Sequence, residues 1–423
     1  MVVTQLLTIA VANTDYNTNA YREALEVLDN IASGYAERVS LPSRLHKPVV
    51  TSLSDVEIVE VEARRYTAIL IVAVTGRTAR LIYNIGVRAE RPVILVSLES
   101  SDALPDVLEA YTALRKDGYG VSKPIIYPRD KHVLDNYMIA AEVLGRHKGA
   151  AYIHIGSVVP WSLYGAVNES RVRMKLNSTI LKMDLNDVVA RLEAVPREKA
   201  EKIAEQLESR GIRFEVGTEE VVKAARLYVA LKKIARDNHA VALSVNCAEL
   251  NSRLDTSAYL ASTLLQEYDN IPLTCDSDVT AAVTASLLAP LTPIGIGKPI
   301  DIRDDGTAVY ALHTPPLSLL KEASVAIHPR ENSVVIRGAI DWRGRVHVVR
   351  LDPDISTLHV CECSVESSEA TPLTTVRLSG CSCVLDIPGS QHILAFNVNR
   401  ETLGALAELL GLRMLAKPTT DTN

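Results

Sequence analysis

Two aspartates one residue apart, Asp276 and Asp278, are the strongest candidates for chemistry in this sequence. They lie in IPLTCDSDVTAAV, between a short apolar run and a helical pattern, and Glu249 and Asp255 precede them. Carboxylates at the end of a strand can bind hard divalent cations or exchange protons with a bound substrate. Carboxylates at a helix start can also simply cap the helix. The residue types leave ligand chemistry and capping both open.

A turn after an apolar run offers a second candidate site. In VAVTGRTARLIYNIG, residues Thr75, Gly76, Arg77 and Thr78 separate a predicted strand from a predicted helix. Amide groups at a helix start bind anions and hydroxyl-rich molecules. The turn matches neither the P-loop nor the dinucleotide-binding fingerprint. It is therefore either a plain strand-to-helix turn or a substrate-binding loop.

A similar turn, HIGSVVPWSLYG, follows a later predicted strand. Open α/β sheets bind ligands at the carboxyl ends of their strands, which makes Ser157 a candidate substrate-binding residue. Trp161 is one of two tryptophans. An indole face stacks on a sugar ring, although large aromatic side chains mostly fill cores. Trp161 is thus a second candidate for substrate contact.

Three of the ten histidines follow predicted strands or turns: His313, His328 and His392. A lone histidine is more often a structural residue than a ligand. His313, directly after the predicted strand TAVYAL, is nevertheless a candidate substrate-binding residue. The sequence contains no G-x-S-x-G nucleophile elbow. Nucleophilic catalysis therefore has no positive support.

Four of the six cysteines form two C-x-C pairs, Cys361 with Cys363 and Cys381 with Cys383. Residues i and i+2 of a strand share a face, so each pair can present two thiols on one side of a sheet. The spacing differs from the C-x2-C of structural zinc sites. We predict small core residues on strands. A metal or disulfide cluster is the alternative, and a hyperthermophilic source would favour it.

The elements that position these residues fall into three predicted segments. Residues 1–150 alternate short apolar runs such as TAILIVAV with helical patterns, which predicts a Rossmann-like domain with a mostly parallel sheet. Residues 151–298 restart the same rhythm and predict a second α/β domain. Residues 299–423 consist of short β-branched runs between polar turns, which predicts an antiparallel β-rich, barrel-like domain with a closing helix capped by Gly411. The tail KPTTDTN is expected to be disordered.

Composition limits the kind of partner. The 423 residues carry a net charge of −6, which argues against a dedicated nucleic-acid-binding protein. The first residues are apolar but lack a basic n-region, so we predict a buried strand and not a signal peptide. No run of about 18 apolar residues is present to span a membrane. We therefore expect a protein of the cytoplasm that binds neither nucleic acid nor membrane.

Taken together, the ordered motifs resemble a known family, the short archaeal proteins related to L-fucose isomerase in the L-fucose/L-arabinose isomerase-like superfamily. The resemblance extends from about residue 65 to residue 415. No single motif is specific, but their order and spacing are. Five stretches carry it: TGRTARLIYNIGVRAERPVILVS, SSDALPDVLEA, IGSVVPWSL, IPLTCDSDVTAAVTASLL and GSQHILAFNVNRETLGALAELLGL.

The resemblance implies an aldose–ketose isomerase. A divalent metal, usually manganese, would bind the C1 and C2 oxygens of an open-chain sugar, and carboxylates would move a proton through an enediol. It implies Asp255 and Asp278 as catalytic residues, with Glu249 as an alternative to Asp255. It implies a homo-oligomer as well. The implied metal ligands are two carboxylates and the imidazole of His392. Asp255 is the candidate for the first carboxylate, and Asp278 is the candidate for the second, with Asp276 as its close rival.

The family's T-G-G-T-E loop is T-G-R-T-A here, with Arg77 and Ala79 in place of a glycine and an acid. Arg77 can bind a phosphate or sulfonate, or block a sugar. The family's C-E-G-D turn is C-D-S-D. We therefore expect an isomerase acting on a sugar or sugar phosphate. The alternative is a non-catalytic carbohydrate- or effector-binding protein on the same scaffold.

Overall fold

The structure is a computed structural model, and it divides into two compact units. Unit 1 comprises Met1–Lys148 and Asn399–Arg413, and unit 2 comprises Gly149–Val398 and Met414–Asn423. The predicted division into three domains stays a prediction. Residues 418–423 of the predicted disordered tail, and the first five residues of the chain, lie outside the described residues. Those described are residues 6–13, 18–34, 39–40, 49–331, 333–370 and 372–417.

Unit 1 is built on a parallel sheet with the strand order β2-β1-β4-β5-β6, and β3 also pairs with β1. Every residue of β4 and β5 is buried, as the continuous apolar runs predict for strands covered on both faces. The strands are β1 (Leu6–Val11), β2 (Val39–Ser40), β3 (Val49–Val50), β4 (Ile69–Ala73), β5 (Val93–Leu98) and β6 (Ile125–Tyr127).

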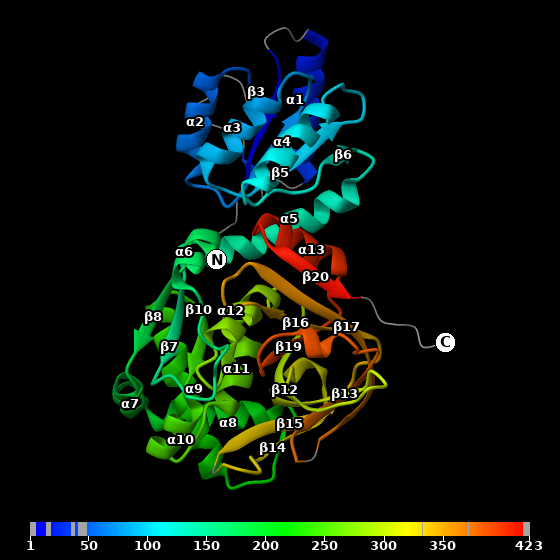
Figure 1. The fold of residues 1–423 in the computed structure, drawn as a ribbon. Helices are drawn as coiled ribbons and strands as arrows, with labels where there is room; N and C mark the ends of the chain where they lie inside the picture. The colour runs from blue at the N-terminus through cyan, green and yellow to red at the C-terminus, as the bar shows by residue number, and fades with distance from the viewer. Residues whose placement is uncertain are drawn as a thin grey trace. The chain divides into compact units, whose positions relative to one another are not determined.

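Helices α2, α3 and α4 pack together against one face of this sheet (Figure 1). Helix α13 comes from the far end of the chain and packs against α5, where the Tyr137 hydroxyl donates to Glu408. The predicted Gly411 cap of α13 is confirmed, because Gly411 has a positive φ of 61°. The helices of unit 1 are α1 (Thr18–Gly34), α2 (Leu53–Ala63), α3 (Ala79–Ala89), α4 (Leu104–Lys116), α5 (Lys131–His147) and α13 (Arg400–Leu409).

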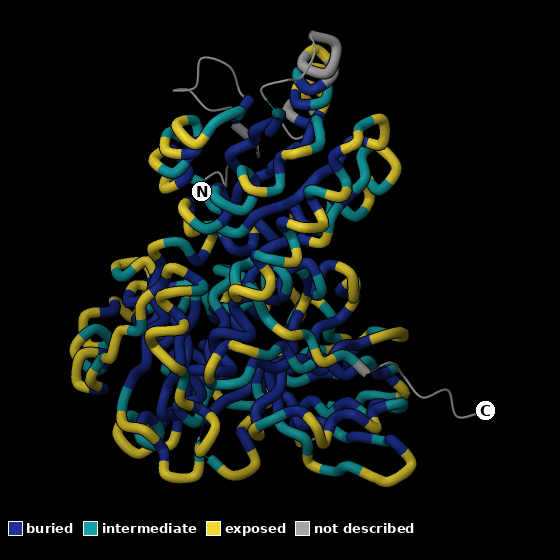
Figure 2. Tube along the Cα trace, turned by 45° about the horizontal axis from the view of Figure 1, so that its top comes forward, coloured by how far each residue is buried: buried dark blue, intermediate teal, exposed yellow. Residues whose placement is uncertain are grey.

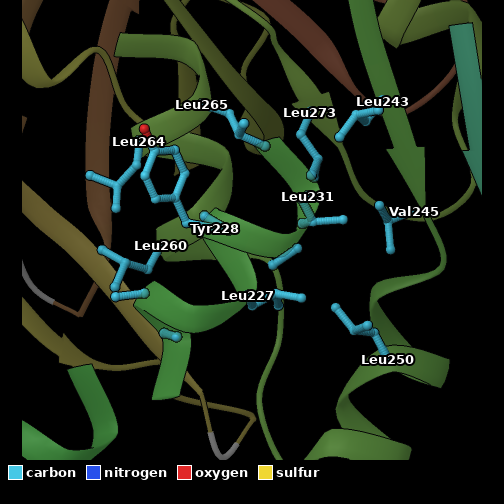
Figure 3. Close-up of a cluster of buried hydrophobic side chains, with 14 of the residues drawn as sticks. Leu227, Tyr228, Leu231, Leu243, Val245, Leu250, Leu260, Leu264, Leu265 and Leu273 are labelled. Atoms are coloured by element: carbon cyan, nitrogen blue, oxygen red, sulfur yellow. The ribbon is translucent and has the colours of Figure 1, made fainter. Parts of the chain in front are cut away.

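Unit 2 begins with a second parallel sheet, ordered β11-β10-β7-β8. Leucines and valines from α9, α10, α11, β10 and β11 fill the core on one of its faces (Figure 3). These strands are β7 (Ala151–Ile155), β8 (Thr179–Met183), β10 (Ala240–Val245) and β11 (Leu273–Thr274). The helices are α6 (Glu169–Leu176), α7 (Leu185–Glu193), α8 (Arg197–Ser209), α9 (Thr218–Asp237), α10 (Cys247–Leu254), α11 (Tyr259–Asp269) and α12 (Val279–Leu288).

The rest of unit 2 is a closed antiparallel barrel of six strands in the order β16-β19-β12-β13-β18-β17, closed by pairing of β17 with β16. Strand β20 adds to β17, and β9, β14 and β15 form a separate small sheet. Helix α12 contacts both β10 and the barrel strands β16 and β19. The remaining strands are β9 (Arg213–Phe214), β12 (Ile294–Ile302), β13 (Ala308–Thr314), β14 (Leu320–Ile327), β15 (Val334–Ile340), β16 (Arg345–Leu351), β17 (Thr357–Glu369), β18 (Thr374–Ser379), β19 (His392–Phe396) and β20 (Arg413–Lys417).

The predicted fold class, two parallel α/β segments followed by an antiparallel barrel, is therefore confirmed. Buried residues follow the strands and the inner faces of the helices, while exposed residues gather on the outer turns (Figure 2). Within the described part of the chain, no helix is both long and apolar enough to cross a membrane.

The C-x-C pairs are cross-linked to each other inside the barrel. Cys361 bonds to Cys383, Cys363 bonds to Cys381, and all four side chains are buried. The structure thus contains the disulfide alternative. One part of the strand prediction is wrong, because β18 ends at Ser379 and Cys381 and Cys383 lie in the turn that follows. A third disulfide joins Cys247 at the start of α10 to Cys275 after β11.

Removal of the Cys247–Cys275 disulfide by the double substitution Cys247→Ala and Cys275→Ala is expected to lower the free energy of unfolding by about 3 kcal/mol. The cross-link spans 28 residues and restricts the unfolded chain. Denaturant midpoints of the variant and the parent measure the effect. As a control, unfolding without reductant should expose no thiol to alkylation, since all six cysteines are paired. Labelled cysteines in the parent would contradict the pairing.

Candidate functional site

A cavity of about 170 Å³ lies in unit 2, between the carboxyl end of β11 and the barrel. It is smaller than pockets for drug-sized ligands, which measure about 300–1,000 Å³, and so suits a small molecule such as a sugar. Most of its lining residues have polar or ionisable side chains. The lining residues are Tyr259, Leu273, Cys275, Asp276, Ile296, Gly297, Lys298, His313, Thr314, His328, Arg330, Glu331 and Gln391.

Asp276 supplies a partly accessible carboxylate to this cavity. The residue lies two positions after the end of β11 and has a positive φ of 55°, which turns the chain sharply before α12. Its Oδ2 accepts hydrogen bonds from the Lys298 ammonium and, at 3.3 Å, from the Gln391 amide. No described residue donates to Oδ1, and the side chain is 20% exposed. One oxygen of Asp276 is therefore available to a ligand, while Lys298 balances its charge.

Two imidazoles line the cavity beside an aromatic ring. Tyr259 stacks on His328 with ring centroids 4.7 Å apart, and His313 lies 5.5 Å from Tyr259. Burial lowers the pKa of His313 and of His328 to about 4, and the charges of Lys298 and Arg330 add to this effect. Both rings are therefore neutral near pH 7. A neutral imidazole can donate one hydrogen bond and accept another.

Glu331 closes this side of the cavity. Its Oε1 accepts a hydrogen bond of 2.9 Å from the Tyr259 hydroxyl, while its Oε2 is buried without a hydrogen-bond partner. Burial raises the pKa of the Glu331 carboxyl, and the charge of Asp276 adds to the rise, whereas the hydrogen bond from Tyr259 and the charge of Lys298 oppose it. Glu331 therefore fixes the tyrosine and adds a second acid to the site.

Asp278 does not line the cavity and forms a buried ion pair instead. Both of its carboxylate oxygens accept hydrogen bonds from the Arg350 guanidinium, at 2.9 and 3.1 Å. The Ala281 amide also donates to Oδ1, so Asp278 caps α12 as the capping interpretation predicts. Burial raises the pKa of the Asp278 carboxyl, and Arg350 opposes that rise. No carboxylate oxygen of Asp278 is left without a partner.

His392, the expected metal-binding histidine, has both ring nitrogens in hydrogen bonds to other residues. Its Nδ1 lies 2.7 Å from the Tyr310 hydroxyl and its Nε2 lies 3.1 Å from the Gly389 carbonyl. The contact with a carbonyl requires that Nε2 carry the proton, which makes Nδ1 the acceptor. Burial lowers the pKa of His392 to about 4. The imidazole is a neutral core residue with both nitrogens in hydrogen bonds.

The two candidates for the first carboxylate lie elsewhere in unit 2. Asp255 ends α10 in the left-handed region, and its side chain is 69% exposed and ion-paired with Lys223. Glu249 accepts hydrogen bonds from the Ser157 amide and hydroxyl at 2.9 and 2.8 Å. These bonds lower the pKa of Glu249. Ser157 thus serves to anchor Glu249, and neither acid lines the cavity.

Trp161 and the loop of Thr75–Thr78 are likewise outside the cavity. Trp161 is 63% exposed on the segment after β7. The loop lies in unit 1, where the amides of Arg77, Thr78 and Ala79 donate to the Asp106 carboxylate and the Gly76 amide donates to Asp102. The protein's own carboxylates therefore occupy the amides that were expected to bind a ligand.

The expected manganese ligands do not fit a metal site as arranged here. Asp278 and His392 already use every donor atom that a cation would need, and Asp255 is paired with Lys223. Within the described ranges, no three His, Cys, Asp or Glu side chains form a group able to hold a metal ion. The carboxylate of Asp276 faces an ammonium group where the resemblance implies a metal.

The fold and cavity define an α/β protein with an acid–base pocket between a parallel sheet and a barrel. No family model matches the chain, and no curated protein is significantly similar to it in sequence. Of the predicted site residues, Asp276 and His313 meet in the cavity. Sequence reasoning missed Lys298, Tyr259 and Glu331, which no local pattern distinguishes from surface or core residues.

Arg350 was also missed, although the sequence contains a signal for it. In the run RVHVVRL, Arg350 shares the strand face of Val346 and Val348. A charged residue on an apolar strand face requires a buried partner of opposite charge. The partner is Asp278, 72 residues earlier. An arginine on an apolar face of a barrel strand thus predicts that a buried acid pairs with it. It does not indicate which aspartate or glutamate that is.

The free energy of unfolding should fall between pH 6.5 and about 4 because of the buried histidines. His313, His328 and His392 have an ordinary pKa of 6.5 and a folded-state pKa of about 4. In this window the unfolded chain binds protons that the folded chain excludes, so stability falls as the pH is lowered. The upper bound is about 3 kcal/mol per fully buried imidazole.

Urea midpoints at pH 7.5 and 4.5 measure this loss of stability. His313→Gln removes one of the three titrating imidazoles and should reduce the difference between the two midpoints. A difference unchanged from that of the parent protein would show that His313 is not the buried neutral group described above.

Proposed function

We propose that the cavity around Asp276 binds an open-chain sugar or sugar phosphate and catalyses proton transfer between C1 and C2. The chain would then be a divergent relative of the L-fucose isomerase-like proteins that its motifs resemble. The observation that carries the proposal is that the partly exposed carboxylate of Asp276 and the neutral imidazole of His313 line the same cavity of sugar size. A carboxylate base beside a neutral imidazole is an arrangement that performs enolisation.

Asp276 and His313 have complementary roles in this reaction. Asp276 Oδ1 removes the proton from C2 of the aldose and returns it to C1, which forms the ketose through an enediol. The neutral His313 donates a proton to the C1 oxygen and accepts one from the C2 hydroxyl. Each proton removed is thereby returned to the product. The lowered pKa of His313 keeps the imidazole neutral, so that it can both donate and accept.

The alternative is a non-catalytic protein that binds a sugar or effector in the same cavity. The ion pair between Asp276 and Lys298 favours it, because the ammonium already occupies one oxygen of the carboxylate that the reaction would use. In that case ligands would raise the melting temperature without being converted. The expected homo-oligomer and the cytoplasmic location remain predictions under both functions.

The test is incubation of the purified protein with a panel of aldoses, ketoses and their phosphates in deuterium oxide, followed by NMR. Proton transfer through an enediol washes solvent deuterium into C1 or C2, even where net conversion is slow. A parallel melting-temperature screen of the same panel detects binding. Deuterium exchange supports the isomerase, binding without exchange supports the alternative, and the absence of both rejects the cavity as a sugar site.

A further inference from the structure

We infer that the Lys298 ammonium supplies the positive charge that a divalent metal supplies in metal-dependent sugar isomerases. This inference rests on the proposed function and adds a catalytic residue to it. Isomerisation through an enediol places negative charge on the C1 and C2 oxygens, and some cation or strong donor has to stabilise it. Asp255, Asp278 and His392, which the resemblance assigns to a metal, are bound to other partners. Asp276, which it also assigns to the metal, lines the cavity and accepts a hydrogen bond from Lys298.

The sequence directs Lys298 into the cavity through an irregularity in β12. The register of β12 against β13 shifts between Ile296 and Gly297, directly before Lys298. A side chain at Gly297 would place its Cβ 2.5 Å from the Ala311 carbonyl oxygen, so only glycine permits this approach of the two strands. Irregularities of this kind re-aim the neighbouring side chains. Gly297 thus sets the direction of Lys298.

An ammonium group has the donors that the reaction needs. It carries three N–H groups, of which one bonds Asp276 Oδ2. The other two are available to the C1 and C2 oxygens of a bound substrate, and the Lys298 side chain is 33% exposed to receive one. Its single charge is weaker than that of a divalent ion. A small, partly buried cavity strengthens that charge, and the neutral donors beside it add to the stabilisation.

The charges around Asp276 and Asp278 agree with this role. Each aspartate of the D-S-D turn is neutralised by a cation of the chain itself, Lys298 for Asp276 and Arg350 for Asp278. A divalent ion would therefore add two positive charges to carboxylates that are already balanced. Lys298 and Arg330, which lower the pKa of the two cavity imidazoles, would also repel it.

The test compares the parent protein with Lys298→Met and Lys298→Arg, using the panel substrate with the fastest deuterium exchange. The expected results are no stoichiometric metal by elemental analysis and exchange unaffected by a chelator. Lys298→Met should lose about 100- to 1,000-fold in rate, as enzymes do when one oxyanion donor is removed. Lys298→Arg keeps the charge and should retain more activity than Lys298→Met. Melting curves verify that both variants fold.

The possible failures are distinguishable. Exchange that a chelator abolishes and manganese restores would overturn the role of Lys298 while leaving the proposed function intact. Stoichiometric manganese whose electron paramagnetic resonance signal changes in Asp276→Asn would overturn it as well, without reference to activity. Full exchange in a folded Lys298→Met variant would also overturn it. The absence of exchange with and without metal would instead reject the proposed function.

Discussion

Asp276→Asn is expected to lower deuterium exchange and net isomerisation by about 100- to 10,000-fold, the usual contribution of a positioned acid–base group. An amide keeps the shape of the side chain, but it cannot accept the proton from C2. Binding of substrate should be less affected, since Lys298, Gln391 and His313 remain in the cavity. Exchange rates measured by NMR, together with melting temperatures in the presence of ligand, separate the two effects.

The matched control for this result is Asp255→Asn. The resemblance assigns Asp255 a catalytic role, whereas the structure places it in an exposed ion pair with Lys223. We expect Asp255→Asn to leave exchange unchanged. If Asp255→Asn abolished exchange and Asp276→Asn did not, the cavity would not be the active site and the assignment by resemblance would be correct.

Asp278→Ala is expected to lower the free energy of unfolding by about 3–5 kcal/mol, because it leaves the Arg350 guanidinium buried without its counter-charge. Arg350 is 0% exposed and, besides Asp278, donates only to the backbone carbonyls of Tyr164 and Gln391 among the described residues. Gly389 packs against the guanidinium so closely that an added Cβ would lie 2.9 Å from it. The site has no room for relaxation. Urea midpoints measure the loss.

Two further variants show whether the loss comes from the buried charge. Asp301→Ala breaks an exposed pair with Arg303 on the barrel and should cost less than about 1 kcal/mol. The double variant Asp278→Leu with Arg350→Met removes both charges and should recover much of the stability lost by Asp278→Ala. A double variant no more stable than Asp278→Ala would mean that the aspartate acts mainly as the cap of α12.

The fold was predictable because each layer leaves a local pattern. The continuous apolar runs of β4 and β5 require helices on both sides, and the short alternating runs after residue 300 require an antiparallel sheet. The sequence does not show that this sheet closes into a barrel. Strands β16 and β17 form a local hairpin, but closure also requires β19 to pair with both β12 and β16. Pairs such as Val348 with Leu394 lie far apart in the sequence, and no turn signal predicts them.

The candidate site was only partly predictable. Asp276 and His313 were recognised because each follows a predicted strand and carries a side chain that can bind a ligand or transfer a proton. Lys298 and Glu331 converge on them only once the barrel packs against the first sheet of unit 2, and no spacing within the sequence encodes that contact. The resemblance assigned Asp278 and His392 to a metal. Residue type alone does not reveal that Arg350 hydrogen-bonds to Asp278 and Tyr310 to His392.

The three disulfides are relevant to the redox state of the compartment in which the protein folds. Such bonds persist in oxidising compartments, and within cells they are common mainly in hyperthermophiles. Two of them lie side by side in the barrel, where the Sγ atoms of Cys361 and Cys363 are 4.0 Å apart. The cytoplasmic location expected from the sequence stays a prediction.

The carboxylate of Asp106, in the first turn of α4, binds the amides at the start of α3 and so competes with any anion for them. It is tethered to the same unit and accepts three amide hydrogen bonds of 2.9–3.0 Å. A tethered group has an effective concentration of at least about the millimolar range, and free phosphate has to exceed this to displace it. The amides of Arg77, Thr78 and Ala79 are therefore satisfied by a carboxylate of the same unit, and an external anion would have to displace Asp106 to reach them.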